Sequence, residues 1–160
     1  LDLSACADAV HRPGCRIYEE RFLRKLRARV RRLEARWPDH LPLDQLSAIR
    51  SIRDYDDRIM APRFGYRDAA DYYHRASAAR VLARITRPTL VLHAEDDPFI
   101  VITPESRRIL AANPRIRFVP TRYGGHCAFL NPHAQEQEED SFWAENRVLD
   151  YCTEALGKFA

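Results

Sequence analysis

The sequence predicts an α/β fold in which a helical segment is followed by parallel strands with crossover helices. Through the first half of the chain, apolar residues recur every three or four positions, which is typical of amphipathic helices. After Pro88, short apolar runs alternate with helical patterns. A strand–helix–strand order of this kind gives parallel neighbours with right-handed crossovers. We therefore predict a helical part over residues 1–86 and a sheet part over residues 87–160.

Each helix of the first part is predicted from its apolar stripe and its boundaries. Residues 15–36 carry one stripe, and Pro38 ends the helix. A second stripe covers residues 43–60, and the segment 61–65 interrupts it because proline removes a donor and glycine admits unusual dihedrals. Short helices are predicted over residues 68–74 and, capped by Ser77, over residues 78–83.

The sheet part begins with a strand at residues 89–93, an apolar run of the kind buried in parallel sheets. Thr103-Pro104-Glu105 then supplies an N-cap, a proline at the first helical position and an acid in the first turn of a helix to about residue 111. Residues 116–119 form the next predicted strand. A last helix is predicted over residues 142–156, behind the acids Glu138, Glu139 and Asp140.

Composition limits the classes of function. The chain is 46% hydrophobic with a net charge of only +3, and its arginine excess indicates coding bias rather than a nucleic-acid partner. The four cysteines lack C-x-x-C spacing and the density of a disulfide scaffold, which favours a reduced, cytoplasmic setting. No apolar run approaches the roughly 18–20 residues of a membrane span. We expect neither a cofactor nor a metal ion.

Two polar positions stand out because each follows an apolar run. Asp97 lies in the segment that follows the first predicted strand, and His126 lies after the second, at a Gly124-Gly125 turn. Ligand chemistry in open α/β sheets lies at the carboxyl ends of strands. A histidine that acts as a general base needs a carboxylate to hold its remote nitrogen and to stabilise the imidazolium. We therefore predict that Asp97 and His126 form a pair.

These stretches resemble the YheT-like branch of the α/β-hydrolase superfamily. The resemblance continues, in family order, through Ile52-Arg53-Asp54-Tyr55-Asp56-Asp57, Gly65-Tyr66-Arg67-Asp68-Ala69, Asp71-Tyr72-Tyr73 and Pro88-Thr89-Leu90. It implies the C-terminal part of an α/β-hydrolase fold, with residues 1–86 as the helical cap or lid and residues 87–160 as the C-terminal part of the core. It also implies a serine hydrolase of carboxylic esters, with a small-molecule substrate that could be acyl or lipid-like. Asp97 would be its triad acid and His126 its triad base.

The nucleophile of such a triad is missing from the sequence. A G-x-S-x-G elbow needs two glycines four positions apart. Gly14, Gly65, Gly124, Gly125 and Gly157 contain no such pair. We therefore expect the chain to be part of a longer hydrolase that carries the serine upstream, so that its partner is the remainder of that parent chain. The isolated chain is then expected to be inactive.

Several alternatives stay open at this point. Asp96 rivals Asp97 as the acid, although in related hydrolases the acid directly precedes a proline, as Asp97 does. His93, Asp96, Asp97 and His126 could together bind a metal ion, although His93 is better explained as a core histidine. The whole chain could instead be a non-catalytic remnant or a binding module.

A basic run forms the last feature of the sequence. Its cations could attract phosphate or an anionic membrane surface, or could simply be the solvated face of a cap helix. The run consists of Arg21, Arg24, Lys25, Arg27, Arg29, Arg31, Arg32 and Arg36. The run is therefore compatible with a peripheral membrane contact through this helix and with an ordinary solvated face.

Overall fold

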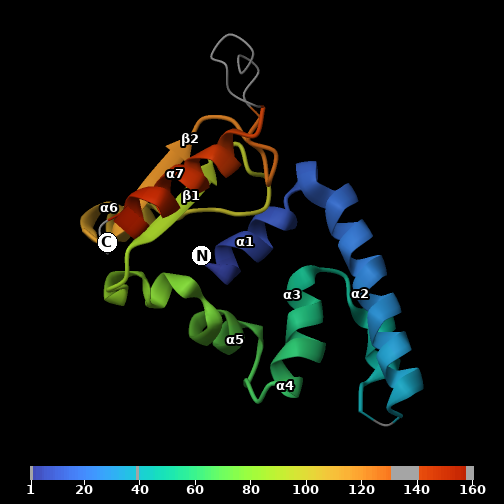
Figure 1. Ribbon diagram of the computed structural model, residues 1–160. Helices are drawn as coiled ribbons and strands as arrows, with labels where there is room; N and C mark the ends of the chain where they lie inside the picture. Colours follow the sequence, from blue (N-terminus) through green and yellow to red (C-terminus); the bar gives the residue numbers. More distant parts are fainter. Residues whose placement is uncertain (1, 39, 131–140, 158–160) are drawn as a thin grey trace. The chain divides into compact units, whose positions relative to one another are not determined.

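The computed structural model describes residues 2–38, 40–130 and 141–157 (Figure 1). The chain divides into two compact units. The first comprises Leu1–Arg80 with Phe99–Val101, and the second comprises Val81–Pro98 with Ile102–Ala160. Each unit has its own secondary structure and is described separately. The assignment of residues 1–86 as a cap and of residues 87–160 as part of the core remains a prediction.

The first unit is helical. It contains α1 (Leu3–Val10), α2 (Arg16–Arg36), α3 (Ile52–Tyr55), α4 (Ala61–Arg63) and α5 (Ala69–Ala76). A π-helical turn, Asp56–Met60, joins α3 to α4, and 3₁₀ turns lie at Pro13–Cys15, Leu43–Ala48 and Ala78–Arg80. The predicted helix over residues 15–36 is confirmed as α2, whereas α1 was not predicted.

The interior of this unit is built on the apolar stripe of α2. Leu23 and Val30 are almost completely buried and pack in one cluster with Leu46, Ile49, Tyr55 and Ile59. Burying such side chains is the main favourable contribution to folding. The opposite face of α2 is left to solvent. α2 is thus divided into an apolar face and a charged face.

The continuous helix predicted over residues 43–60 is wrong. The structure has a 3₁₀ turn there, then extended backbone at Ile49 and Ser51, and only then α3. Ser51 accepts a hydrogen bond from the Asp54 N–H, and the Asp54 carboxylate accepts one from the Ser51 N–H. This capping box stabilises a helix start at Ile52. From there the helical segment continues through Pro62, which lies in the first turn of α4, and ends before Gly65 at φ +73°.

The helix predicted over residues 78–83 is also wrong. Two 3₁₀ turns, Ala78–Arg80 and Leu82–Arg84, take its place. The Ser77 hydroxyl does not cap it. It donates instead to the carbonyl of Tyr73 and accepts a hydrogen bond from the Leu3 N–H. Ser77 thereby ties α1 to the end of α5, because both segments use the same buried hydroxyl.

The second unit contains a parallel strand pair. β1 (Thr89–Ala94) and β2 (Ile116–Thr121) pair in register from Thr89↔Ile116 to Ala94↔Thr121. Figure 1 shows the two strands side by side, with α7 (Trp143–Gly157) lying along them. The crossover contains α6 (Pro104–Ala112), whose Thr103 N-cap accepts from the Ser106 N–H as predicted. The alternation of parallel strands and helices confirms the predicted α/β fold class. Residues Glu138, Glu139 and Asp140 lie outside the described residues.

Candidate active site

The strand register brings two loops to the same edge of the sheet. Ala94 ends β1, Thr121 ends β2, and these two residues are paired neighbours. The Glu95 N–H extends the ladder by one step because it donates to the Thr121 carbonyl at 2.8 Å. The segments 95–98 and 122–126 therefore start next to each other at the carboxyl ends of the strands. This is the edge at which α/β sheets place their ligand chemistry.

His126 and Asp97 meet across these loops. Nδ1 of His126 lies 3.0 Å from Oδ2 of Asp97. The Asp97 side chain is only 5% exposed, whereas the His126 side chain is 48% exposed. A buried carboxylate at this distance fixes the ring orientation and favours the tautomer with the proton on Nδ1. Chemically, a histidine whose Nδ1 is held by a carboxylate can exchange a proton through its other nitrogen.

Asp96 has a different partner. Its Oδ1 accepts a hydrogen bond from the Gly125 N–H at 2.8 Å, so it fastens the second loop next to the first. The structure thus separates the two aspartates that the sequence left as rivals, because Asp97 contacts the imidazole and Asp96 contacts backbone. Sequence reasoning missed this anchoring role of Asp96. The Asp-Asp doublet itself was its only signal.

Two glycines let the second loop pass close to the strand. A Cβ on Gly124 would lie 2.8 Å from the Phe129 ring and 2.9 Å from Cβ of Ala94, which is closer than real Cβ atoms approach. Gly125 has φ +56°, in the left-handed region that glycine adopts without penalty. The turn just before His126 therefore needs glycine for two separate reasons, close approach and backbone conformation.

His93 lies within β1 rather than in the loops. It is a buried residue, and burial lowers the pKa of its imidazole, an effect that the nearby Asp97 carboxylate partly opposes. Burial therefore favours the neutral form of this imidazole. In the described part of the chain, no group of three or more His, Cys, Asp and Glu side chains is arranged to hold a metal ion.

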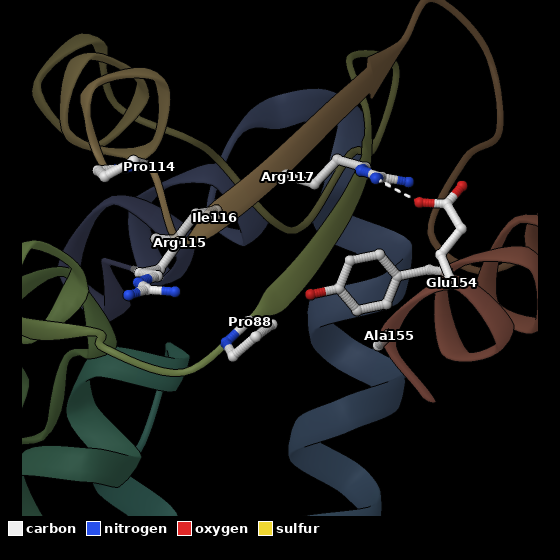
Figure 2. Close-up of a pocket in the computed structure, with 8 residues that line it drawn as sticks. Pro88, Pro114, Arg115, Ile116, Arg117, Glu154 and Ala155 are labelled. Atoms are coloured by element: carbon white, nitrogen blue, oxygen red, sulfur yellow. Dashed lines mark hydrogen bonds and ion pairs between the residues drawn. The ribbon is translucent and has the colours of Figure 1, made fainter. Parts of the chain in front are cut away.

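A cavity lies at the other end of the strands. It has a volume of about 550 Å³ and is lined by Pro88, Arg115, Ile116 and residues of α7. Figure 2 shows Arg117 reaching across to Glu154, and the two are joined at 2.6 Å. The Arg117 guanidinium also lies 5.2 Å from the centre of the Tyr151 ring. Arg117 is thus already paired, and the cavity lies near the amino ends of the strands, away from the edge at which α/β sheets place their ligand chemistry.

Sequence comparison identifies relatives over most of the chain. The YheT protein of Escherichia coli is 36% identical over 96% of this chain and 45% of its own length. Phospholipase ABHD3 of Mus musculus is 33% identical over 79% of this chain and 31% of its own. Medium-chain fatty acid ethyl ester synthase/esterase 2 of Saccharomyces cerevisiae is 32% identical over 69% of this chain and 23% of its own length. The chain belongs to the α/β-hydrolase superfamily.

This α/β-hydrolase chain spans less than half the length of those relatives. No family model matches it, and no solved structure matches it. Relatives include an esterase, phospholipases and a monoacylglycerol lipase, which supports a hydrolase origin. Among the described residues, no helix is both long and apolar enough to cross a membrane. None of the four cysteines forms a disulfide in these parts of the chain.

Proposed function

We propose that this chain supplies the acid and the base of a serine carboxylic-ester hydrolase. The observation that carries the proposal is the 3.0 Å contact between Nδ1 of His126 and the buried carboxylate of Asp97, at the carboxyl ends of parallel strands. No G-x-S-x-G segment occurs in the 160 residues. The nucleophilic serine is therefore proposed to come from a segment outside them.

The proposed chemistry is acyl transfer through a covalent intermediate. Nε2 of His126 takes the proton of the serine hydroxyl while the serine oxygen attacks the ester carbonyl. The imidazolium then gives that proton to the leaving alcohol, and the C–O bond of the ester breaks to leave an acyl-serine. Water repeats the sequence and releases the carboxylic acid. Throughout, Asp97 orients the ring and stabilises its positive charge.

The substrate class proposed is an ester with an acyl chain. Relatives are named for phospholipid, monoacylglycerol and fatty acid ethyl ester chemistry, and all of these are acyl esters. The first unit contains a mainly apolar cleft of about 360 Å³. Its walls include Leu26, Val30, Leu33, Met60 and Phe64, together with the charged residues Arg29, Asp56 and Arg63. A cleft of this kind suits part of an acyl chain, since ligand pockets are mostly apolar and of similar volume.

The proposal is tested by hydrolysis of p-nitrophenyl butyrate. Two proteins are compared, this chain alone and the same chain extended upstream through its coding frame, each with and without His126→Ala. Activity of the extended protein that is lost with His126→Ala supports the proposal. If the short chain is active and this activity depends on His126, a nucleophile must lie within these residues. That result would contradict the proposal that the serine lies outside them.

The competing function is a non-catalytic binding module. It is favoured by the same absence of an elbow motif in the 160 residues. An extended protein without a serine elbow, or one whose activity does not change with His126→Ala, would support that function and contradict the hydrolase.

A further inference from the structure

The solvent side of α2 carries a row of cations with no carboxylate among them. We define the cationic row as Arg21, Lys25, Arg29, Arg32 and Arg36, all of which are exposed. With 3.6 residues per turn and 1.5 Å rise per residue, the five positions fall within about 80° of arc and extend over about 22 Å. The row is therefore straight, narrow and uniformly positive.

The three acids of α2 all point elsewhere. Glu19 is buried. Its carboxylate lies 2.9 Å from Nδ1 of His11 and accepts a hydrogen bond from the Ile52 N–H. Glu34 accepts from the Leu41 N–H at 2.7 Å, and Glu20 lies 3.8 Å from Arg27, which is not in the row. Among the described residues, no member of the row forms an ion pair with a carboxylate.

The charge pattern of this row differs from that of a helix face that only contacts solvent. Exposed helices gain stability when acids and bases alternate at i,i+4, whereas like charges at that spacing destabilise the helix. The row contains three such like-charge pairs, Arg21/Lys25, Lys25/Arg29 and Arg32/Arg36. An external anionic surface would relieve this repulsion.

Apolar side chains flank the row at both ends. Ile17, in the first turn of α2, is 85% exposed. Trp37, which follows the last turn, is 52% exposed and lies under the Arg36 guanidinium at 5.2 Å. Tryptophan beside basic residues is typical of side chains at a lipid headgroup boundary. No Asn, Gln, Ser or Thr occurs in α2, so the face has none of the amide and hydroxyl groups that read base edges.

We propose that the cationic row of α2 docks the protein on an anionic lipid bilayer. A straight row over about four turns matches a flat surface, and its charges match phosphate headgroups. Ile17 and Trp37 would enter the headgroup region at either end. The docking does not depend on catalysis, so it stands whether or not His126 acts as a base.

The test is binding to sedimented vesicles of phosphatidylcholine, with and without phosphatidylglycerol. The chain should bind the mixed vesicles, not those of phosphatidylcholine alone, and should detach when salt is raised from about 0.1 M to about 1 M. The row variant Arg21→Gln/Lys25→Gln/Arg29→Gln/Arg32→Gln should bind about 100-fold more weakly or worse. The matched variant Arg12→Gln/Arg50→Gln/Arg58→Gln/Arg80→Gln loses the same charge from exposed sites outside α2 and should bind nearly as the parent does.

Several other results would contradict docking on lipid. Equal weakening in the two variants would mean that only net charge matters, and this would overturn it. Tighter binding to a single-stranded oligonucleotide than to anionic vesicles, lost in the row variant, would assign the row to nucleic acid instead. If circular dichroism shows that the row variant does not fold, two milder variants replace it. The variant in which the four arginines of the cationic row, Arg21, Arg29, Arg32 and Arg36, are changed to lysine should still bind. The variant Arg21→Gln/Arg32→Gln should bind more weakly. Weak binding of the lysine variant or full binding of the double variant would contradict the proposal.

Discussion

Nδ1 of His126 lies 3.0 Å from the Asp97 carboxylate, although the two residues are 29 positions apart in the sequence. Both side chains come from loops that leave paired strands at the same edge. The contact therefore depends on the β1–β2 register, since a slip of one residue would reverse the face of every side chain in the strand.

Asp97→Asn tests the role of this contact. An amide at position 97 cannot stabilise the imidazolium and can present a donor to Nδ1, which favours the wrong tautomer. In the extended protein, we expect kcat for p-nitrophenyl butyrate to fall about a thousandfold or more. Asp96→Asn is the matched control, because its amide oxygen can still accept the Gly125 N–H. A similar loss in both variants would show that the pair acts through loop structure alone.

Gly124→Ala tests the close approach of the second loop. The added Cβ would meet the Phe129 ring and Ala94 at less than 3.0 Å, so either the loop or the strand must shift. We expect the free energy of unfolding to fall by about 1–3 kcal/mol in denaturant titrations. Gly14→Ala is the control, since no heavy atom lies within 4 Å of its Cβ position. Unchanged stability of Gly124→Ala would show that the loop is not constrained there.

His93→Gln tests the pH dependence that burial produces. Because burial lowers the pKa of His93 in the folded chain, the unfolded chain takes up the proton first as pH falls below about 6.5. Protons then favour unfolding, so the free energy of unfolding should decrease from pH 7 towards pH 5. His93→Gln should flatten this part of the stability curve. The exposed His74→Gln should leave it unchanged, and an equally steep curve in His93→Gln would contradict the assignment.

Thr103→Ala tests the start of the crossover helix. Its Oγ1 accepts the Ser106 N–H at 3.2 Å, one of the amides that α6 cannot pair internally. Loss of this cap should lower the free energy of unfolding by about 1 kcal/mol. Thr103→Ser keeps the oxygen and should restore most of that stability in the same thermal or denaturant measurement. If both substitutions cost the same, the methyl group and not the cap is responsible.

The second unit could be predicted well because its signals are local. The apolar runs, the Thr103-Pro104-Glu105 cap and the order of elements each identify one segment, and the strand order then brings Asp97 near His126. The choice between Asp96 and Asp97 has no local signal of this kind. Neighbouring residues in a turn point in different directions, so only three-dimensional geometry shows which carboxylate meets the ring.

The first unit was predicted less well for a physical reason. Leu46, Ile49 and Ile52 keep a helical spacing of three, yet the backbone is extended at Ile49. The apolar side chains of this stripe pack in the core although the helix is not continuous. The Ser51–Asp54 capping box was a usable signal for the break. The π-helical turn at Asp56–Met60 and the short α1 leave no comparable pattern.

The hydrogen bonds that fasten the two loops have a consequence for local opening. The Glu95 amide is bonded to Thr121 and the Gly125 amide to Asp96, so both loops are connected to the strand ends and to each other. Protons on these amides should exchange with solvent at rates close to those of the strand amides, rather than at the fast rates usual for surface loops. The backbone that supports the His126–Asp97 contact would then open together with the strand pair, so its local stability would be that of the sheet.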